Sequence, residues 1–242
     1  MKEYGYEIEE FNIGLLTPLR FAQWCHPYEK RKIFSCVDVE KMKLWVHEGF
    51  TCLDIGAYTG DTTVIIAAAA GKTGHVIAFE PNPCAYKILT INSQLNPEIA
   101  CIQIENVAIM ETPGEFLFSY IDEDFCNGGY YKTVAPDHTH RLIVQGLELK
   151  QYIKNIKIDF LKIDAEGYDQ AIIESNLWLL ERDKPTLVFE VYPYLTLKEK
   201  KILCDTITKA NYCMKDVFSG ADLLSDDVLS ITSCYNIVAI PQ

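Results

Sequence analysis

The fold is decided by residues 52–61, which read Cys52-Leu53-Asp54-Ile55-Gly56-Ala57-Tyr58-Thr59-Gly60-Asp61. The apolar start predicts a buried strand, and the glycines predict a tight turn into a helix that begins near Thr62. A second apolar run, Val76-Ile77-Ala78-Phe79, ends at Glu80. This order is typical of a nucleoside-binding unit, in which backbone amides hold the polar tail and the acid accepts the ribose hydroxyls. Taken alone, the turn could also be an ordinary strand-to-helix connection.

The spacing of the glycines bears on which nucleoside would bind. A dinucleotide site has the pattern G-x-G-x-x-G, whereas Gly56 and Gly60 here enclose three residues and are followed by Asp61. A pyrophosphate at the helix N-terminus would face that carboxylate in a low dielectric, which is unfavourable. A cofactor with a cationic or zwitterionic tail fits Asp54 and Asp61 better. S-adenosylmethionine has such a tail, with a sulfonium, an ammonium and no phosphate.

Composition limits the class of protein. The chain has 242 residues, 49% of them hydrophobic, which is enough for one sizeable α/β core. Its formal net charge is −12, so nucleic acid and anionic membranes are disfavoured as partners. A small molecule or a carbohydrate is easier to accommodate.

The cysteines and the N-terminus suggest a compartment. Nine cysteines are dispersed without a C-x-x-C pair, and Cys52, Cys101 and Cys213 lie in apolar runs typical of buried reduced thiols. The first residues are polar and acidic, unlike a signal peptide, and the longest apolar run, Val64 to Ala70, is too short to cross a bilayer. We therefore expect a soluble protein of the reducing cytoplasm.

Strands and helices alternate from about residue 49 onward. This alternation predicts a doubly wound, mostly parallel α/β sheet of seven strands. The last two strands, Tyr212–Val217 and Tyr235–Ile240, are joined without a crossover helix, so the final strand is expected to be antiparallel. A helix is expected over Val39–His47, and another begins at Pro83 with Asn82 as its N-cap.

Two segments lie outside this alternation. Residues 1–48 are expected to form an N-terminal extension that packs on the core or over the site, ahead of the main domain at 49–242. An insertion at about 112–146 interrupts the domain, and such insertions often recognise substrate. Both segments could equally form the contacts of a homodimer.

Carboxylates follow several of the predicted strands. Asp54, Glu80, Asp164 with Glu166, and Glu190 all stand at the carboxyl ends of apolar strands. In a parallel sheet these ends share one edge, where the ligand crevice lies. Buried carboxylates are rare without a partner, so their placement suggests a site, although any one of them could be a helix cap.

Five motifs in order resemble those of the FkbM family of S-adenosylmethionine-dependent methyltransferases. They are Asp54-Ile55-Gly56-Ala57-Tyr58-Thr59-Gly60, Ala78-Phe79-Glu80-Pro81-Asn82-Pro83, Asn106-Val107-Ala108-Ile109, Leu161-Lys162-Ile163-Asp164-Ala165-Glu166-Gly167-Tyr168 and Phe189-Glu190-Val191-Tyr192-Pro193. The resemblance covers about residues 49–193. It implies a class I methyltransferase fold, Rossmann-like, and O-methylation of a sugar or polyketide-like hydroxyl.

The resemblance also implies roles for matching positions in binding the cofactor. Asp54, Gly56, Ala57 and Gly60 would form the wall around the methionine end, and Asp164 would lie near the amino group or the transferring methyl. Glu80, followed by Pro81, would hold the ribose hydroxyls, and Asn106 and Ala108 would flank the adenine. Tyr58 stands where the family usually has Asn, and we expect it near the methionine end.

A hydroxyl acceptor must lose its proton, and the sequence offers several bases. We predict Asp164, Glu166 and His138 as catalytic candidates, with His140 a further one because histidine titrates nearest neutral pH. A divalent metal held by Asp164 and Glu166 is an alternative that we do not expect. An NAD-dependent oxidoreductase and a catalytically silent binding module are the rival functions.

Overall fold

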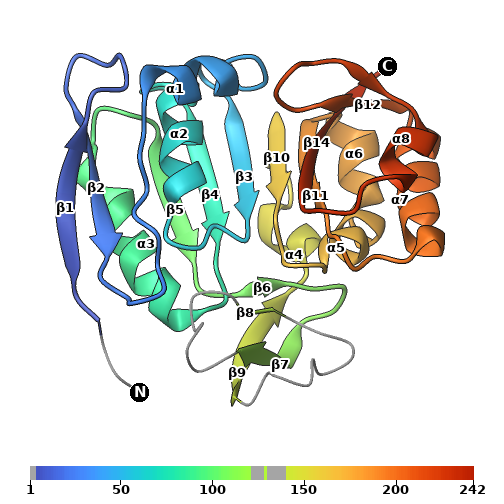
Figure 1. Cartoon of the computed structure of the whole chain (residues 1–242), viewed down its shortest axis with the longest axis horizontal. Helices are drawn as coiled ribbons and strands as arrows, with labels where there is room; N and C mark the ends of the chain where they lie inside the picture. The colour runs from blue at the N-terminus through green and yellow to red at the C-terminus, as the bar shows by residue number, and fades with distance from the viewer. Residues whose placement is uncertain (1–3, 121–127, 130–139) are drawn as a thin grey trace.

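A computed structural model describes residues 4–120, 128–129 and 140–242. Its centre is an eight-stranded sheet in the order β13-β12-β14-β11-β10-β3-β4-β5 (Figure 1). The strands are β3 (Thr51–Ile55), β4 (His75–Phe79), β5 (Cys101–Glu105), β10 (Phe160–Ile163), β11 (Thr186–Val191), β12 (Tyr212–Asp216), β13 (Asp222–Leu223) and β14 (Tyr235–Pro241). The strands from β5 to β11 run parallel, and β14 is antiparallel to both its neighbours. The eighth strand, β13, is a two-residue edge strand that the predicted seven do not include.

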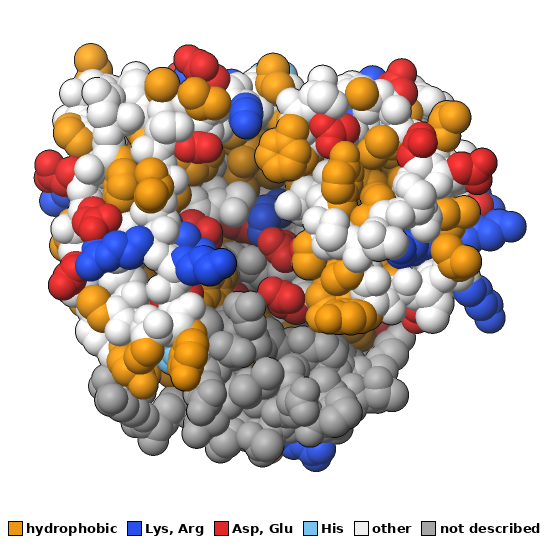
Figure 2. Space-filling model, in the orientation of Figure 1, with side chains coloured by type: hydrophobic (Ala, Val, Ile, Leu, Met, Phe, Trp, Pro, Cys, Tyr) orange, Lys and Arg blue, Asp and Glu red, His pale blue; other side chains and the backbone are white. Residues whose placement is uncertain are grey.

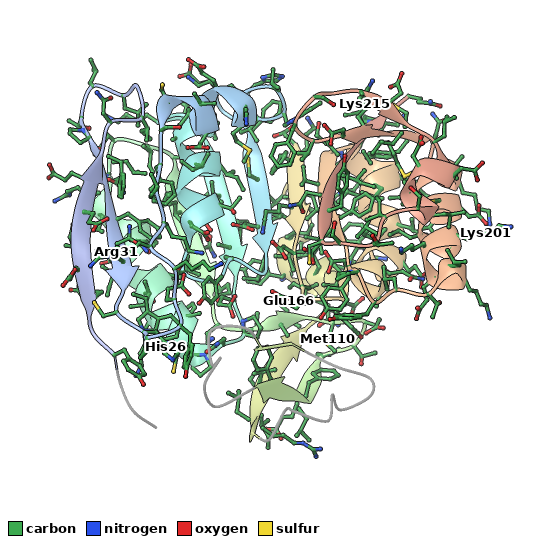
Figure 3. All side chains as sticks on the ribbon, in the orientation of Figure 1. His26, Arg31, Met110, Glu166, Lys201 and Lys215 are labelled. Atoms are coloured by element: carbon green, nitrogen blue, oxygen red, sulfur yellow. The ribbon has the colours of Figure 1, made fainter. Side chains whose placement is uncertain are left out.

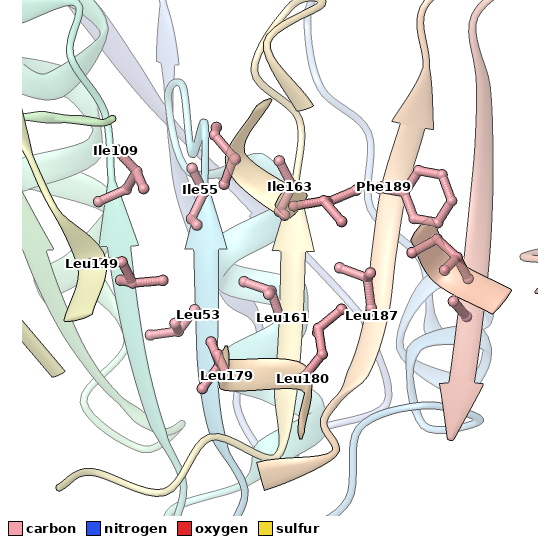
Figure 4. Close-up of a cluster of buried hydrophobic side chains, with 14 of the residues drawn as sticks. Leu53, Ile55, Ile109, Leu149, Leu161, Ile163, Leu179, Leu180, Leu187 and Phe189 are labelled. Carbon is pink, nitrogen blue, oxygen red and sulfur yellow. The ribbon is translucent and has the colours of Figure 1, made fainter. Parts of the chain in front are cut away.

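The central strands form because nearly all of their side chains are buried and most of them are apolar; the paired Asp54 and Lys162 are the charged side chains in β3 and β10. Every residue of β10 is buried, and so are four of the five residues of β3. On one face Leu53 and Ile55 align with Leu161 and Ile163 across the β3–β10 pair (Figure 4). Continuous apolar runs of this kind are what a parallel sheet covered on both sides requires.

Eight helices connect or cover the strands within the described residues. They are α1 (Cys36–Met42), α2 (Asp61–Ala70), α3 (Pro83–Leu95), α4 (Leu149–Ile153), α5 (Asp169–Ser175), α6 (Leu177–Asp183), α7 (Leu197–Lys209) and α8 (Ser225–Leu229). The side chain of Asn82 accepts the backbone N–H of Cys84 at 2.9 Å, which confirms the predicted cap of α3. The helix expected at Val39–His47 spans Cys36–Met42 instead: it starts earlier, since Ser35 and Asp38 form a capping box at its N-terminus, and it ends before His47.

The N-terminal residues form a hairpin beside the sheet. Strands β1 (Tyr6–Phe11) and β2 (Leu19–Trp24) pair antiparallel and lie next to α3 (Figure 1). The amide side chain of Asn92 in α3 accepts the backbone N–H of Ala22 at 2.7 Å, and that of Asn96 accepts the backbone N–H of Arg20 at 2.8 Å. The hairpin is therefore fixed to α3 by side chain–backbone hydrogen bonds.

A second, four-stranded sheet lies below the carboxyl ends of β3 and β4 in Figure 1. Its order is β6-β9-β7-β8, with β6 (Ala108–Ile109), β7 (Gly114–Tyr120), β8 (Gly128–Gly129) and β9 (His140–Leu147). Strands β7, β8 and β9 belong to the segment predicted as an insertion.

Two further observations concern the predicted compartment. Cys52 is buried, but Cys101 is exposed and Cys213 is half-buried. The prediction of a buried Cys101 was wrong because β5 is an edge strand of the main sheet. No helix in the described part of the chain has the length and apolar character to span a bilayer.

Candidate functional site

A cavity of about 430 Å³ opens at the carboxyl ends of β3, β4 and β10. Figure 2 shows this face hollowed near its centre, with acidic and basic side chains around the hollow. Glu166 lies in this central region, and Met110 lies nearby toward the small sheet (Figure 3). Cofactor sites commonly have volumes of about 300–1,000 Å³, so the cavity is large enough for a nucleoside ligand.

The turn after β3 forms the floor of this cavity and requires glycine. Gly56 has φ +80°, a left-handed conformation that favours glycine. A Cβ at this position would lie 1.8 Å from the carbonyl oxygen of Asp164. The backbone N–H groups of Gly56 and Ala57 both donate to the carbonyl of Phe79 at 3.0 Å. The turn is thus held tightly between the ends of β4 and β10.

Replacing Gly56 by alanine should therefore damage the site. Because the new Cβ would meet backbone rather than a flexible side chain, we expect Gly56→Ala to destabilise the fold by about 1–3 kcal/mol or more. Urea unfolding of this variant, beside a Gly5→Ala control where a Cβ meets nothing within 4 Å, measures the effect. Equal stability of the two variants would contradict the close approach.

Glu80 is buried at the end of β4 and lines the cavity. Its two carboxylate oxygens each accept one backbone N–H, from Tyr58 and from Asn82, both at 2.7 Å. Burial raises the pKa of Glu80 to about 7, although these two hydrogen bonds oppose the rise. A carboxylate has about four lone-pair positions, so Glu80 retains acceptor capacity for two hydroxyls.

Lys162 connects two of the predicted acids beneath the cavity. Its ammonium lies 3.2 Å from Oδ1 of Asp54 and 3.4 Å from Oδ2 of Asp164. Thr63 donates its hydroxyl to the other oxygen of Asp54 at 2.6 Å. Burial opposes the charge of Lys162, but the two carboxylates outweigh it and raise the pKa of Lys162. The lysine therefore stays charged and neutralises the acids at this edge of the sheet.

Glu166 follows β10 in a left-handed conformation, with φ +51°, and lines the cavity. Burial raises the pKa of Glu166 to about 7, and the nearby charges of Asp164 and Asp169 add to the rise. Asp169 is buried and accepts the backbone N–H of Ala165 at 3.1 Å and that of Glu190 at 3.3 Å. Asp169 thus fixes the loop that carries Glu166 against the end of β11.

Tyr58 connects the glycine turn to the N-terminal segment. It has φ +52°, a conformation that asparagine adopts more readily than tyrosine. Its backbone N–H donates to Glu80, and its hydroxyl donates to the carboxylate of Glu29. Through its larger side chain, Tyr58 therefore contacts Glu29 from a position where the family usually has asparagine.

Seven of the predicted site residues line the cavity, namely Gly56, Tyr58, Glu80, Pro81, Ala108, Asp164 and Glu166. Asp54, Ala57, Gly60 and Asn106 do not line it. The side chain of Asp54 lies beneath the cavity and is paired with Lys162. The side-chain amide of Asn106 donates to the backbone carbonyl of Glu80 at 2.8 Å. Asp54, Ala57 and Gly60 were expected in the wall around the methionine end and Asn106 beside the adenine; they lie outside the lining of this cavity, and their roles in binding the cofactor stay predictions. His138 lies outside the described residues, as does the side chain of His140.

Sequence reasoning missed two contributions to the cavity. Lys162 stood within a quoted motif, but its partner Asp54 is 108 residues away in the chain, so only the pairing of β3 and β10 shows its role. The segment Tyr28–Lys32 supplies Tyr28, Glu29, Lys30 and Lys32 to the cavity wall. The short basic run Lys30-Arg31-Lys32 after Glu29 was the available signal, and nothing in the sequence related it to residue 61.

The residues present fit S-adenosylmethionine. Gly56 lines the cavity and, having no Cβ, lets the turn lie directly against the backbone of Asp164, and Glu80 offers a buried carboxylate with unused acceptor positions. Carboxylates also outnumber cations in the wall, which suits a sulfonium and an ammonium better than a phosphate. Among the described residues, no group of three or more His, Cys, Asp or Glu side chains is placed to hold a metal ion.

The order of the main sheet, with its antiparallel β14, and the cavity at the carboxyl ends define a class I methyltransferase fold. The family model described as the methyltransferase FkbM domain matches residues 54–212, and the chain belongs to this family. Its cofactor is S-adenosylmethionine. Membership decides against the NAD-dependent oxidoreductase.

Solved structures are similar at low sequence identity. A Clostridium thermocellum protein that carries the name rRNA-methylase is 11% identical, with 85% of this chain and 93% of that chain covered and a TM-score of 0.50, and shows the same fold. The methyltransferase FkbM from Methylobacillus flagellatus KT is 13% identical, with 79% of this chain covered and a TM-score of 0.47; the match spans 43% of that chain. A Thermotoga maritima S-adenosylmethionine-dependent O-methyltransferase is 12% identical, with a TM-score of 0.49; the match covers 89% of this chain and 68% of that chain. No curated protein sequence matches the chain.

Proposed function

We propose that this methyltransferase transfers a methyl group to a hydroxyl oxygen of a sugar or polyketide-like small molecule. The observation that carries the proposal is Glu166, a carboxylate that lines the cavity and whose pKa burial raises to about 7. Such a group is a general base suited to neutral pH. The net charge of −12 supports a small or carbohydrate acceptor over a nucleic acid or an anionic membrane.

When bound, S-adenosylmethionine supplies an activated methyl group on a sulfonium. The protein then has to orient the acceptor oxygen in line with the carbon–sulfur bond, and Glu166 takes the proton that the hydroxyl loses. Asp164 is the other candidate base in the described wall, but its carboxylate is paired with Lys162 at 3.4 Å. We therefore choose Glu166 as the base.

A Glu166→Gln variant should lower kcat by about 10²–10⁴-fold, because a general base is removed while the shape of the side chain is kept. In the unmodified protein the base must be deprotonated, so kcat should rise as pH increases through about 7 and then level off. Steady-state methyl transfer to a panel of glycosides and polyketide hydroxyls, followed by S-adenosylhomocysteine release from pH 5.5 to 9, measures both effects. Calorimetric titration with S-adenosylhomocysteine serves as the control and should change by less than about threefold.

Three outcomes would contradict this proposal in different ways. If Glu166→Gln keeps full turnover, the base is another residue, with Asp164→Asn as the next test. If chelation of divalent metals abolishes turnover, the metal-assisted alternative with Asp164 and Glu166 holds instead. If no hydroxylated acceptor is methylated although the cofactor binds, the silent binding module is favoured.

We also propose a cytoplasmic location, which the dispersed reduced cysteines support.

A further inference from the structure

The wall of the cavity at the start of α2 comes from the N-terminal extension. Tyr28, Glu29, Lys30 and Lys32 line the cavity together with Tyr58, Asp61 and Thr62. Asp61 and Thr62 are the first two residues of α2, a ten-residue helix whose N-cap is Gly60. The segment at 28–32 and the N-terminal end of α2 thus face the same space.

Lys32 is the centre of the contacts between these two segments. Its ammonium lies 3.1 Å from Oδ2 of Asp61 and 3.2 Å from Oε1 of Glu29. It also lies 5.3 Å from the centre of the Tyr58 ring, and the hydroxyl of Tyr58 donates to Glu29. An ammonium has three N–H donors, so after the two carboxylates Lys32 has a third to offer a ligand in the cavity.

The charges at this end of the cavity alternate in sign. The lysine stands between Glu29 and Asp61, and the first N–H groups of α2 add a partial positive charge beside Asp61. The amino-acid end of S-adenosylmethionine is a zwitterion, with one carboxylate and one ammonium on the same carbon. Such an end is matched by a cation and an anion placed side by side.

The other two lysines of the cavity wall are less suited than Lys32 to binding the carboxylate of a ligand. Lys162 is buried, and its ammonium is directed at Asp54, Asp164 and the carbonyl of Gly56. Lys30 is exposed, so its charge is screened by water. Lys32 is mostly buried and held in place by two carboxylates, and so its position is set before a ligand arrives.

We propose that Lys32 binds the carboxylate of the methionine end of the cofactor and that Asp61 faces its ammonium. The N-terminal extension then completes the cofactor site rather than only packing beside it. This inference rests on the proposed use of the cavity for S-adenosylmethionine, and it adds a residue that lies outside the segment matched by the family model.

The test compares two ligands that differ in the amino-acid end. S-adenosylhomocysteine has both charged groups, whereas 5′-methylthioadenosine has the same nucleoside without them. Isothermal titration calorimetry of the unmodified full chain, Lys32→Met and the exposed control Lys72→Met gives affinities for both. We expect Lys32→Met to lose about 10–100-fold in affinity for S-adenosylhomocysteine, as for one charge-assisted hydrogen bond. Its affinity for 5′-methylthioadenosine, and both affinities of Lys72→Met, should change less than about threefold.

The outcomes separate this inference from the proposed function. An equal loss for both ligands would mean that Lys32 only holds the extension in place, and no loss for either would mean that it does not reach the cofactor; each overturns the inference while the cofactor site stands. An unmodified chain that binds neither ligand would overturn the cofactor site, and the inference with it. Lys32→Arg should restore most of the lost affinity, and Lys32→Gln is the second variant if Lys32→Met does not fold.

Discussion

Glu80→Gln is expected to reduce the affinity for S-adenosylhomocysteine by about 100-fold or more. Two ribose hydroxyls each lose a charged acceptor, and a hydrogen bond to a charged group contributes about 1.5–3 kcal/mol. An amide keeps the size of the side chain but turns one acceptor oxygen into a donor. Calorimetric titration at pH 8, where the carboxylate is ionised, measures the effect.

The same experiment has a pH dependence with a defined sign. Because burial raises the pKa of Glu80 to about 7, the unmodified protein should bind the ligand more weakly as pH falls below 7, and the Glu80→Gln variant should lack that contribution. Glu181→Gln, an exposed position in α6, is the matched control and should bind like the unmodified protein. An unchanged affinity in Glu80→Gln would remove Glu80 from the ribose site.

Stability has to be measured beside affinity, because Glu80 also serves the fold. Its oxygens accept the N–H groups of Tyr58 and Asn82, so the glutamine leaves one of these donors without an acceptor. Because the pKa of Glu80 is raised in the folded protein, ionisation of Glu80 lowers the free energy of unfolding as pH rises above the ordinary glutamate pKa of 4.5. The neutral glutamine does not have this destabilising effect. The two effects oppose each other, and we expect a folded variant by circular dichroism.

Features encoded within a few neighbouring residues could be predicted from the sequence. The apolar runs before Gly56 and Glu80 define β3 and β4, and the Asn82-Pro83 pair defines the start of α3 within one residue. The positions of the carboxylates at strand ends followed from the same pattern, since parallel strands end at one edge. Periodicity and cap chemistry are local properties, and they need no knowledge of distant partners.

Features that depend on which distant segments meet could not be predicted. Asp54 and Gly56 were both assigned to the cofactor wall; Gly56 lines the cavity, but the side chain of Asp54 points to Lys162 of the neighbouring strand. The role of Lys32 depends on where the N-terminal hairpin packs, and hydrogen bonds from that hairpin to Asn92 of α3 and to Asn96, the C-cap of α3, fix its position. A single sequence contains no signal for either pairing.

Lys162→Met is expected to lower the free energy of unfolding by about 3–5 kcal/mol. Removing one partner of a buried ion pair leaves the other uncompensated, and here Asp54, with no exposed surface, would be left beside Asp164 without its cation. The raised pKa of Lys162 means that its stabilising charge is fully present below the ordinary lysine pKa of 10.5 and lost only at more alkaline pH. Urea unfolding at pH 7 measures the free energy of unfolding of this variant. Lys157→Met, which removes the exposed partner of Asp159, is the control.

A double variant identifies the cause of that loss. If the uncompensated carboxylates are responsible, Lys162→Met combined with Asp54→Asn should regain a large part of the stability, because the anion at the centre of the sheet is gone. A deficit that the second substitution does not change would show that Lys162 stabilises the sheet through the packing of its alkyl chain, and that the charge network between β3 and β10 contributes little.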